Sequence, residues 1–137
     1  MALKNTYSTK HAGYYIEKIE NALVAGGASG IGKFYEDGRI VGLQFTLPIQ
    51  DKQINFKMPV GWKKVQQVLK NEGERRASED DYAYRVSWAI MKDWVEAQMA
   101  IIASENVTMP QLFLPFAVAS NGDTLFEAVM DSKLLLN

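Results

Sequence analysis

The chain has 137 residues, of which 47% are hydrophobic and 23% charged, and its formal net charge is −1. These values are ordinary for one globular domain, so we expect residues 1–137 to form a single domain. The absence of cysteine excludes disulfides, zinc–thiolate sites and thiol nucleophiles, and it fits a reducing compartment. The N-terminus lacks the apolar stretch of a signal peptide, and no apolar run reaches the ~18 residues of a membrane span. We therefore predict a cytoplasmic protein without a membrane partner.

The N-terminal region is predicted to be helical after a short flexible end. Apolar residues recur at three- and four-residue spacing over residues 9–25, which is typical of an amphipathic helix. Residues 1–8 precede this pattern, and we expect them to be flexible.

A three-stranded antiparallel meander is predicted next. Residues 29–47 have the pattern of a β-hairpin, because Asp37-Gly38 is a strong two-residue turn signal and the second arm alternates between apolar and polar residues. Pro48 is expected to end the second strand. A third strand follows a polar turn and is expected to end at Pro59.

The second half of the chain is predicted to be helical. A short helix over about residues 61–71 leads into a polar loop at residues 71–80. The longest helix, over about residues 79–103, has apolar residues around most of its circumference. Such a helix belongs in the core or in a subunit interface.

Two threonines are predicted to begin the last helices. Thr108 with Gln111 forms a capping box, and Thr124 caps the final helix. The fold class is therefore α+β: an N-terminal helix, the meander, then a long central helix and short helices packed on one sheet face. Since a three-stranded sheet leaves exposed edges, a homodimer built on the long helix or on a sheet edge is a further hypothesis.

A glycine-rich segment, Gly26-Gly27-Ala28-Ser29-Gly30-Ile31-Gly32, resembles the dinucleotide loop of short-chain dehydrogenases. That loop requires a preceding strand and a following helix, so that the pyrophosphate meets a helix N-terminus. Here the segment follows a predicted helix and leads into a predicted strand. We therefore interpret it as a helix C-cap and connection, and we predict no cofactor.

A local basic excess suggests a binding surface. Over residues 61–76, five cations oppose two carboxylates, and three more candidates recur along the long helix. Arginine and lysine beside a tryptophan can hold phosphate and stack a base. The alternative is a solvated helix face with Lys92 paired to Glu96 and the aromatic side chain in the core. The candidate set, called the basic surface below, is Lys63, Lys64, Arg75, Arg76, Arg85, Trp88 and Lys92.

Two further sets of polar residues are candidates for catalytic or metal-binding groups. Glu79, Asp80 and Asp81 could hold a divalent metal, but negative charge is also favoured at a helix N-terminus. His11, the single histidine, has no orienting partners in the sequence and is expected on the surface. No catalytic residue and no metal ligand is therefore predicted, and a non-enzymatic role is favoured.

Three segments resemble a family of small uncharacterised proteins of phages, prophages and related mobile elements. They are Tyr35-Glu36-Asp37-Gly38-Arg39-Ile40-Val41, the string Arg85-Val86-Ser87-Trp88-Ala89-Ile90-Met91-Lys92-Asp93-Trp94-Val95-Glu96-Ala97-Gln98-Met99, and Phe113-Leu114-Pro115. The likeness runs from about Ile16 to Leu136, and the glycine-rich segment is not part of it. The resemblance implies a host bacterial cytoplasm as the setting and names no activity.

Three functions remain as hypotheses. The first is a non-catalytic binding protein of a phage or mobile element that acts on a host protein or nucleoprotein, in a counter-defence role for example. The second is a nucleic-acid-binding accessory protein of phage replication or recombination, which would bind DNA or RNA through the basic surface. The third is a small metal-dependent hydrolase or nuclease built on Glu79, Asp80 and Asp81.

Overall fold

The computed structural model describes residues 3, 5–6, 10–104 and 107–132. Five of the eight N-terminal residues predicted to be flexible lie outside the described residues. The chain divides into two compact units, one made of residues 1–22 and 60–98 and the other of residues 23–59 and 99–137. The single domain stays a prediction.

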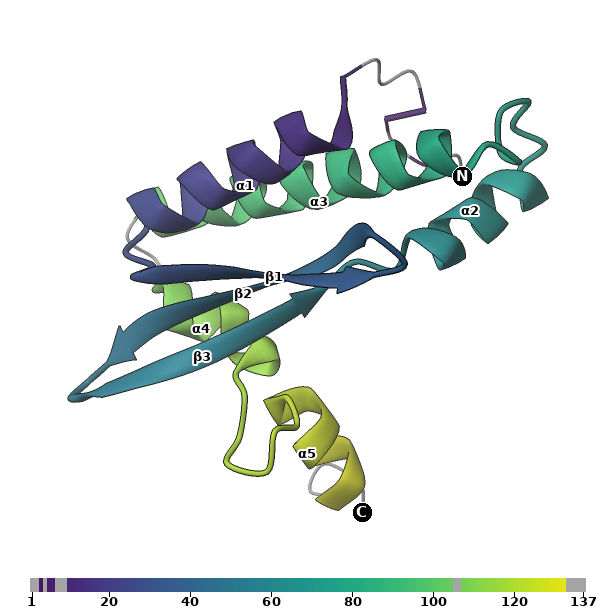
Figure 1. Cartoon of the computed structure of the whole chain (residues 1–137). Coiled ribbons are helices and arrows are strands. Elements are labelled where there is room, and N and C mark those ends of the chain that lie inside the picture. The colour runs from purple at the N-terminus through teal and green to yellow at the C-terminus, as the bar shows by residue number, and fades with distance from the viewer. Residues whose placement is uncertain (1–2, 4, 7–9, 105–106, 133–137) are drawn as a thin grey trace. The chain divides into compact units, whose positions relative to one another are not determined.

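The first unit is helical. It contains most of α1 (Ala12–Ala25), all of α2 (Trp62–Asn71) and most of α3 (Asp80–Ala103). The helices α1 and α3 run side by side (Figure 1). Each begins and ends close to the predicted residues, because amphipathic spacing is a strong local signal. The buried side chains include Tyr15, Ile16, Ile19, Trp62, Leu69, Tyr82, Val86, Trp88 and Val95.

Helix α2 is joined to the start of α3 by aromatic and polar contacts. The rings of Trp62 and Tyr84 meet edge to face with centroids 6.0 Å apart. The Gln66 amide donates to the Ala77 carbonyl at 3.0 Å and to the Asp80 carboxylate at 2.9 Å. These bonds give the loop between the helices a defined path.

The loop itself, residues 72–79, consists of turns. It starts with a Schellman motif at the end of α2, where Gly73 adopts a φ of 74°. The N–H of Gly73 donates to the Lys70 carbonyl and that of Glu74 to the Leu69 carbonyl. The described residues at the N-terminus also bond to this unit: Leu3 donates to the Glu72 carboxylate, Asn5 donates to Asp93, and Thr6 accepts from the Tyr82 hydroxyl.

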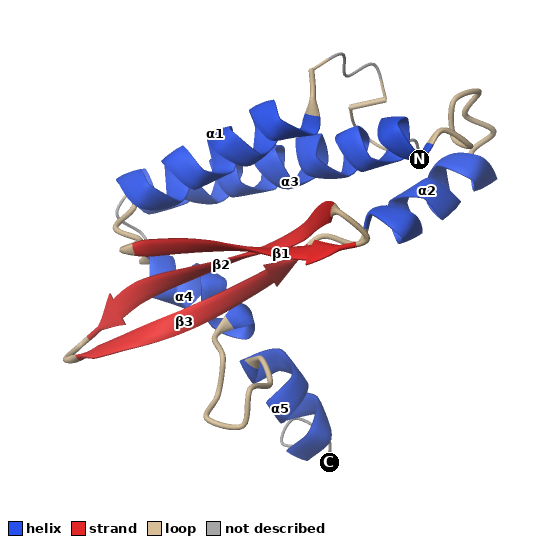
Figure 2. Ribbon diagram, in the orientation of Figure 1, coloured by secondary structure: helices blue, strands red, loops and turns tan. Residues whose placement is uncertain are grey.

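The second unit contains the sheet. Strands β1 (Gly30–Glu36), β2 (Arg39–Ile49) and β3 (Lys52–Pro59) pair antiparallel in the order β1-β2-β3 (Figure 2). Asp37 and Gly38 both have positive φ, 51° and 80°. Two positive φ values make a type I′ turn, whose twist matches that of the paired strands. The predicted meander is confirmed.

The prediction that Pro48 ends the second strand is wrong, because β2 continues to Ile49. The Thr46 carbonyl accepts from the Ser29 N–H, so the backbone groups of Thr46 face β1. Pro48, two residues on, faces the same side. Strand β1 begins at Gly30, opposite Thr46, so Pro48 lies beyond the first residue of β1 and its missing N–H removes no bond to that strand.

One face of the sheet forms the core of the second unit. Phe45 and Phe56 stack with centroids 5.3 Å apart, and Phe113 meets Phe45 edge to face at 5.4 Å. Phe113 ends α4 (Met109–Phe113), which leads into the short η1 (Leu114–Phe116) and later α5 (Leu125–Ser132). The α+β class is confirmed. None of the helices within the described residues has the length and apolarity that crossing a bilayer demands.

Candidate binding surfaces

Trp88 does not belong to the basic surface. Its side chain is 0% exposed, so its ring has no free face on which a base could stack. The prediction of Trp88 as a binding residue is therefore wrong. The helical spacing of Trp88 therefore reflects packing in the core.

Two members of the basic surface are paired with carboxylates. The Lys92 ammonium lies 2.9 Å from Glu96 and 3.2 Å from Asp93. The hydrogen bond to Glu96 raises the pKa of Lys92. The guanidinium of Arg76 makes two hydrogen bonds to the Glu79 carboxylate, at 3.1 and 3.2 Å, and this contact lowers the pKa of Glu79. Phosphate would have to compete with these partners.

A third member, Arg85, is half-buried against an aromatic ring. Its guanidinium carbon lies 5.5 Å from the centroid of Tyr82, and that of Arg76 lies 4.8 Å from the same ring. Both arginines thus contribute cation–π contacts to a buried tyrosine. The charges of both arginines therefore stabilise the start of α3 through the Tyr82 ring.

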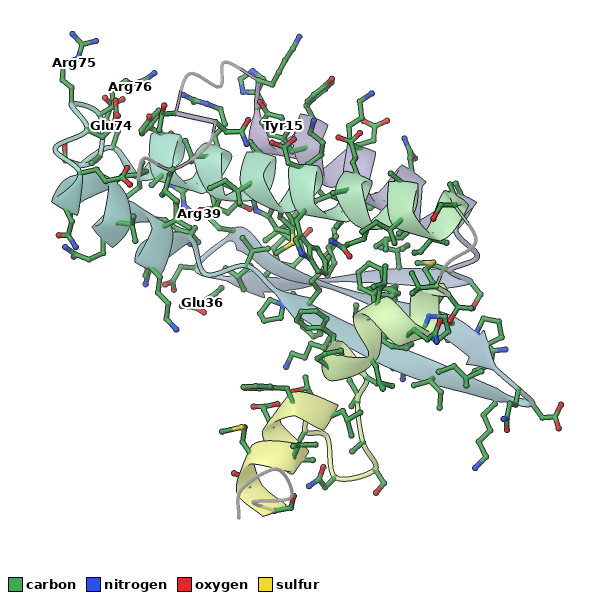
Figure 3. All side chains as sticks on the ribbon, turned by 180° about the vertical axis from the view of Figure 1, so that it is seen from behind. Tyr15, Glu36, Arg39, Glu74, Arg75 and Arg76 are labelled. Carbon is green, nitrogen blue, oxygen red and sulfur yellow. The ribbon has the colours of Figure 1, made fainter. Side chains whose placement is uncertain are left out.

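Three members remain on the exposed surface: Lys63, Lys64 and Arg75. The two lysines stand in the first turn of α2, while Arg75 follows the helix, on the loop where Figure 3 also shows Arg76. A ten-residue helix is roughly 15 Å long. The two lysines and Arg75 therefore stand at opposite ends of α2 instead of meeting at one point.

The carboxylates before α3 do not form a metal site. Glu79 is held by Arg76, and Asp80 accepts from Gln66. Across the described ranges, no group of three histidine, aspartate or glutamate side chains could hold a metal ion. The described residues thus give no support to a metal-dependent hydrolase built on these carboxylates, which stays a hypothesis. His11 is exposed, as predicted.

The glycine-rich segment is a helix cap and connection, as predicted. The N–H of Gly27 donates to the Val24 carbonyl and that of Ala28 to the Leu23 carbonyl, both at 3.0 Å, which is the Schellman pattern. Gly27 has a φ of 111°. The segment lies at the carboxyl end of α1, where the helix dipole disfavours phosphate.

An apolar surface that the sequence analysis did not single out lies on α5. None of the eight residues of α5 is buried, and Phe126 and Met130 are 59% and 50% exposed. Leu114, on the neighbouring η1, is 44% exposed. Isolated apolar side chains on a surface are ordinary, but a grouped set marks an interaction site. Phe126 and Met130 lie one turn apart on the same side of α5, and we call these two side chains the apolar surface.

Helix α5 is held in place by hydrogen bonds at its start. The Leu125 N–H donates to the Ala117 carbonyl at 2.7 Å, and the Val118 N–H donates to Asn55 of β3 at 2.8 Å. Thr124 and Glu127 bond reciprocally: the Thr124 N–H donates to the Glu127 carboxylate and the Glu127 N–H to the Thr124 hydroxyl. The apolar surface therefore stands on a fixed element.

The sequence carried a signal for this surface. At about 100° per residue, Leu125, Phe126, Val129 and Met130 span an arc of about 140° around α5. A helix of eight residues has a small side, so it buries only part of so wide an arc. Half of the arc is left to solvent.

The chain was compared with family models, with curated proteins and with solved structures, and none of the three comparisons finds a match.

Proposed function

We propose that this protein is a non-catalytic binding protein whose partner is another protein, and that it binds the partner through the apolar surface of α5. The observation that carries the proposal is the exposure of Phe126 and Met130, on a helix that buries none of its own residues. Covering a large apolar side chain stabilises a complex by about 1.5–3 kcal/mol. Protein interfaces commonly depend on a few such large side chains at their centre, presented by a helix whose position is fixed.

The setting of the proposal comes from the resemblance to small phage and mobile-element proteins. In that setting the partner is a host protein or nucleoprotein, and interference with a defence system is one role that a binding protein can fill. The pairing of Arg76 and Lys92 with carboxylates also favours a protein partner over a polyanion.

Site-specific crosslinking tests the proposal. Phe126 is replaced by the photo-reactive p-benzoylphenylalanine in the full chain, which is then irradiated in bacterial extract. We expect one dominant crosslinked protein, identified by mass spectrometry, and its loss when Met130→Ser is added. The control places the same group at Val68, which is 40% exposed on α2. Equal crosslinking from both positions, or none from Phe126, would refute the proposed surface.

A second candidate is the nucleic-acid-binding accessory protein, which the exposed cations Lys63, Lys64 and Arg75 favour. Binding to single- and double-stranded DNA and RNA is measured by fluorescence polarisation at two salt concentrations. If this candidate is right, binding falls steeply with salt and is weakened by Lys64→Ala with Arg75→Ala. Lys92→Ala serves as the control, because that ammonium is already paired. Absence of binding at low salt removes this candidate.

A further inference from the structure

The exposed side of α5 carries two parallel stripes. Phe126 and Met130 form the apolar stripe. Glu127 and Asp131 form the acidic stripe, which lies about 100° further around the helix because each of its residues follows an apolar one. All four side chains are exposed, while Leu125, Ala128 and Val129 on the other side are half-buried. A partner that covers the apolar stripe therefore lies against the acidic stripe as well.

Between residues 119 and 132 every charged side chain is acidic, and Lys133 follows this stretch in the sequence. Residues 119–132 contain Asp123, Glu127 and Asp131 and neither lysine, arginine nor histidine. Hydrogen bonds from the Thr124 backbone and hydroxyl lower the pKa of Glu127, and Lys57 adds a smaller attraction. Glu127 is thus ionised at neutral pH.

This charge discriminates between the possible occupants of the apolar surface. A second copy of the chain would bring its own acidic stripe against the first, and like charges at an interface are repulsive. Anionic lipid and nucleic acid are repelled for the same reason. A basic protein surface gains attraction at the stripe and covers the apolar side chains together with it.

We infer that the partner presents a basic, apolar groove, into which α5 docks as an amphipathic helix with Phe126 and Met130 as anchors and Glu127 and Asp131 as its charged edge. This inference rests on the proposed function, since it names the partner chemistry of the same surface. Helix-in-groove recognition of this kind uses anchors one turn apart. Electrostatic complementarity then sets which grooves are accepted.

The test uses the full chain and a defined probe. The probe is a fluorescent amphipathic helical peptide of leucine and lysine, with a leucine–glutamate peptide of the same length as its counterpart. We expect the lysine peptide alone to bind, with affinity that falls as salt rises. Glu127→Gln with Asp131→Lys should weaken binding about tenfold. Glutamine keeps the hydrogen-bond acceptor at the start of α5.

A matched control separates local from overall charge. Glu17→Gln with Asp51→Lys changes the net charge by the same amount at two exposed positions on other elements, α1 and the turn between β2 and β3. We expect this variant to bind the lysine peptide as the unchanged chain does. Equal weakening in both double variants would overturn the inference, because overall charge alone would then explain the binding.

The inference and the proposed function fail in different ways. If Phe126→Ser with Met130→Ser abolishes binding while the charge variant does not, the surface is right and a basic partner is wrong. If neither double variant changes binding, the apolar surface itself is wrong. Binding to phosphatidylglycerol vesicles would show that the surface binds lipid, and it would overturn the inference. Sedimentation as a dimer that becomes a monomer in Phe126→Ser with Met130→Ser would show that the surface binds a second copy, and it would overturn the inference as well.

Discussion

Residues of one chemical type have opposite environments in this protein. Trp88 is 0% exposed and Phe126 is 59% exposed, although both are aromatic residues at helical spacing. Lys92 is paired with two carboxylates, whereas Lys64 stands in solvent at the start of α2. Residue type and spacing identified Trp88, Lys64 and Lys92 as candidates, but they did not show which of these side chains remain accessible to a partner.

At this scale a glycine in the sheet gives a sharp prediction. Gly42 is buried opposite Pro59, and an added Cβ would lie 3.0 Å from the Met58 carbonyl oxygen and 3.2 Å from the Pro59 Cα. Backbone atoms of a paired strand cannot move aside as a flexible side chain does. We expect Gly42→Ala to lower the free energy of unfolding by about 1–3 kcal/mol, measured by urea denaturation.

The control for this prediction is another strand glycine. An added Cβ at Gly30 meets nothing within 4 Å. Gly30→Ala should therefore leave the free energy of unfolding within about 0.5 kcal/mol of the unchanged chain, or raise it slightly by restricting the unfolded state. Equal losses from both substitutions would show that the close approach around Gly42 does not matter.

At the scale of elements, helix caps were the most predictable features. The Thr108 hydroxyl accepts from the Gln111 N–H and the Gln111 side chain accepts from the Thr108 N–H, as the capping box requires. Thr124 caps α5 in the same way with Glu127. Such motifs depend on residues three positions apart, so a short stretch of sequence contains all of the information.

The cap of α5 predicts a dependence on pH. Because the pKa of Glu127 is lowered in the folded chain, its ionised form stabilises the start of α5. That contribution is complete above the ordinary pKa of a glutamate and is lost as the pH falls through the lowered value. We expect Thr124→Val, which removes the hydroxyl, to raise the midpoint of the Glu127 carboxyl titration followed by NMR.

Thr108→Val is the matched control for that titration, because it removes the equivalent hydroxyl from α4. The Glu127 midpoint should not move in this variant. A midpoint that stays constant in Thr124→Val as well would mean that the hydroxyl does not contribute to the low pKa.

At the scale of the whole molecule, the two compact units raise the question of cooperativity. The boundary between them falls inside α1 and inside α3, after residues 22 and 98. Helix formation is cooperative along a continuous segment, so unfolding of one part of α3 destabilises the rest. We therefore expect the 137 residues to unfold in a single transition, as the predicted single domain requires.

Tryptophan fluorescence makes this expectation testable. All three tryptophans, Trp62, Trp88 and Trp94, belong to the first unit, whereas Phe45 lies in the core of the second. Phe45→Leu should lower the midpoint of thermal unfolding seen by fluorescence as much as the midpoint seen by circular dichroism. A fluorescence midpoint that does not move would show that the two units unfold independently.

The sequence by itself determined the order of the helices and strands, the Asp37-Gly38 turn, the Thr108–Gln111 capping box and the Thr124 cap. These features are decided by neighbours a few residues away, so local chemistry is sufficient. Only the tertiary structure decided that Trp88 is buried, that Arg76 and Lys92 are paired, that β2 continues through Pro48 and that Phe126 and Met130 face solvent. Burial and strand pairing depend on residues distant in sequence, and a short pattern contains no information about them.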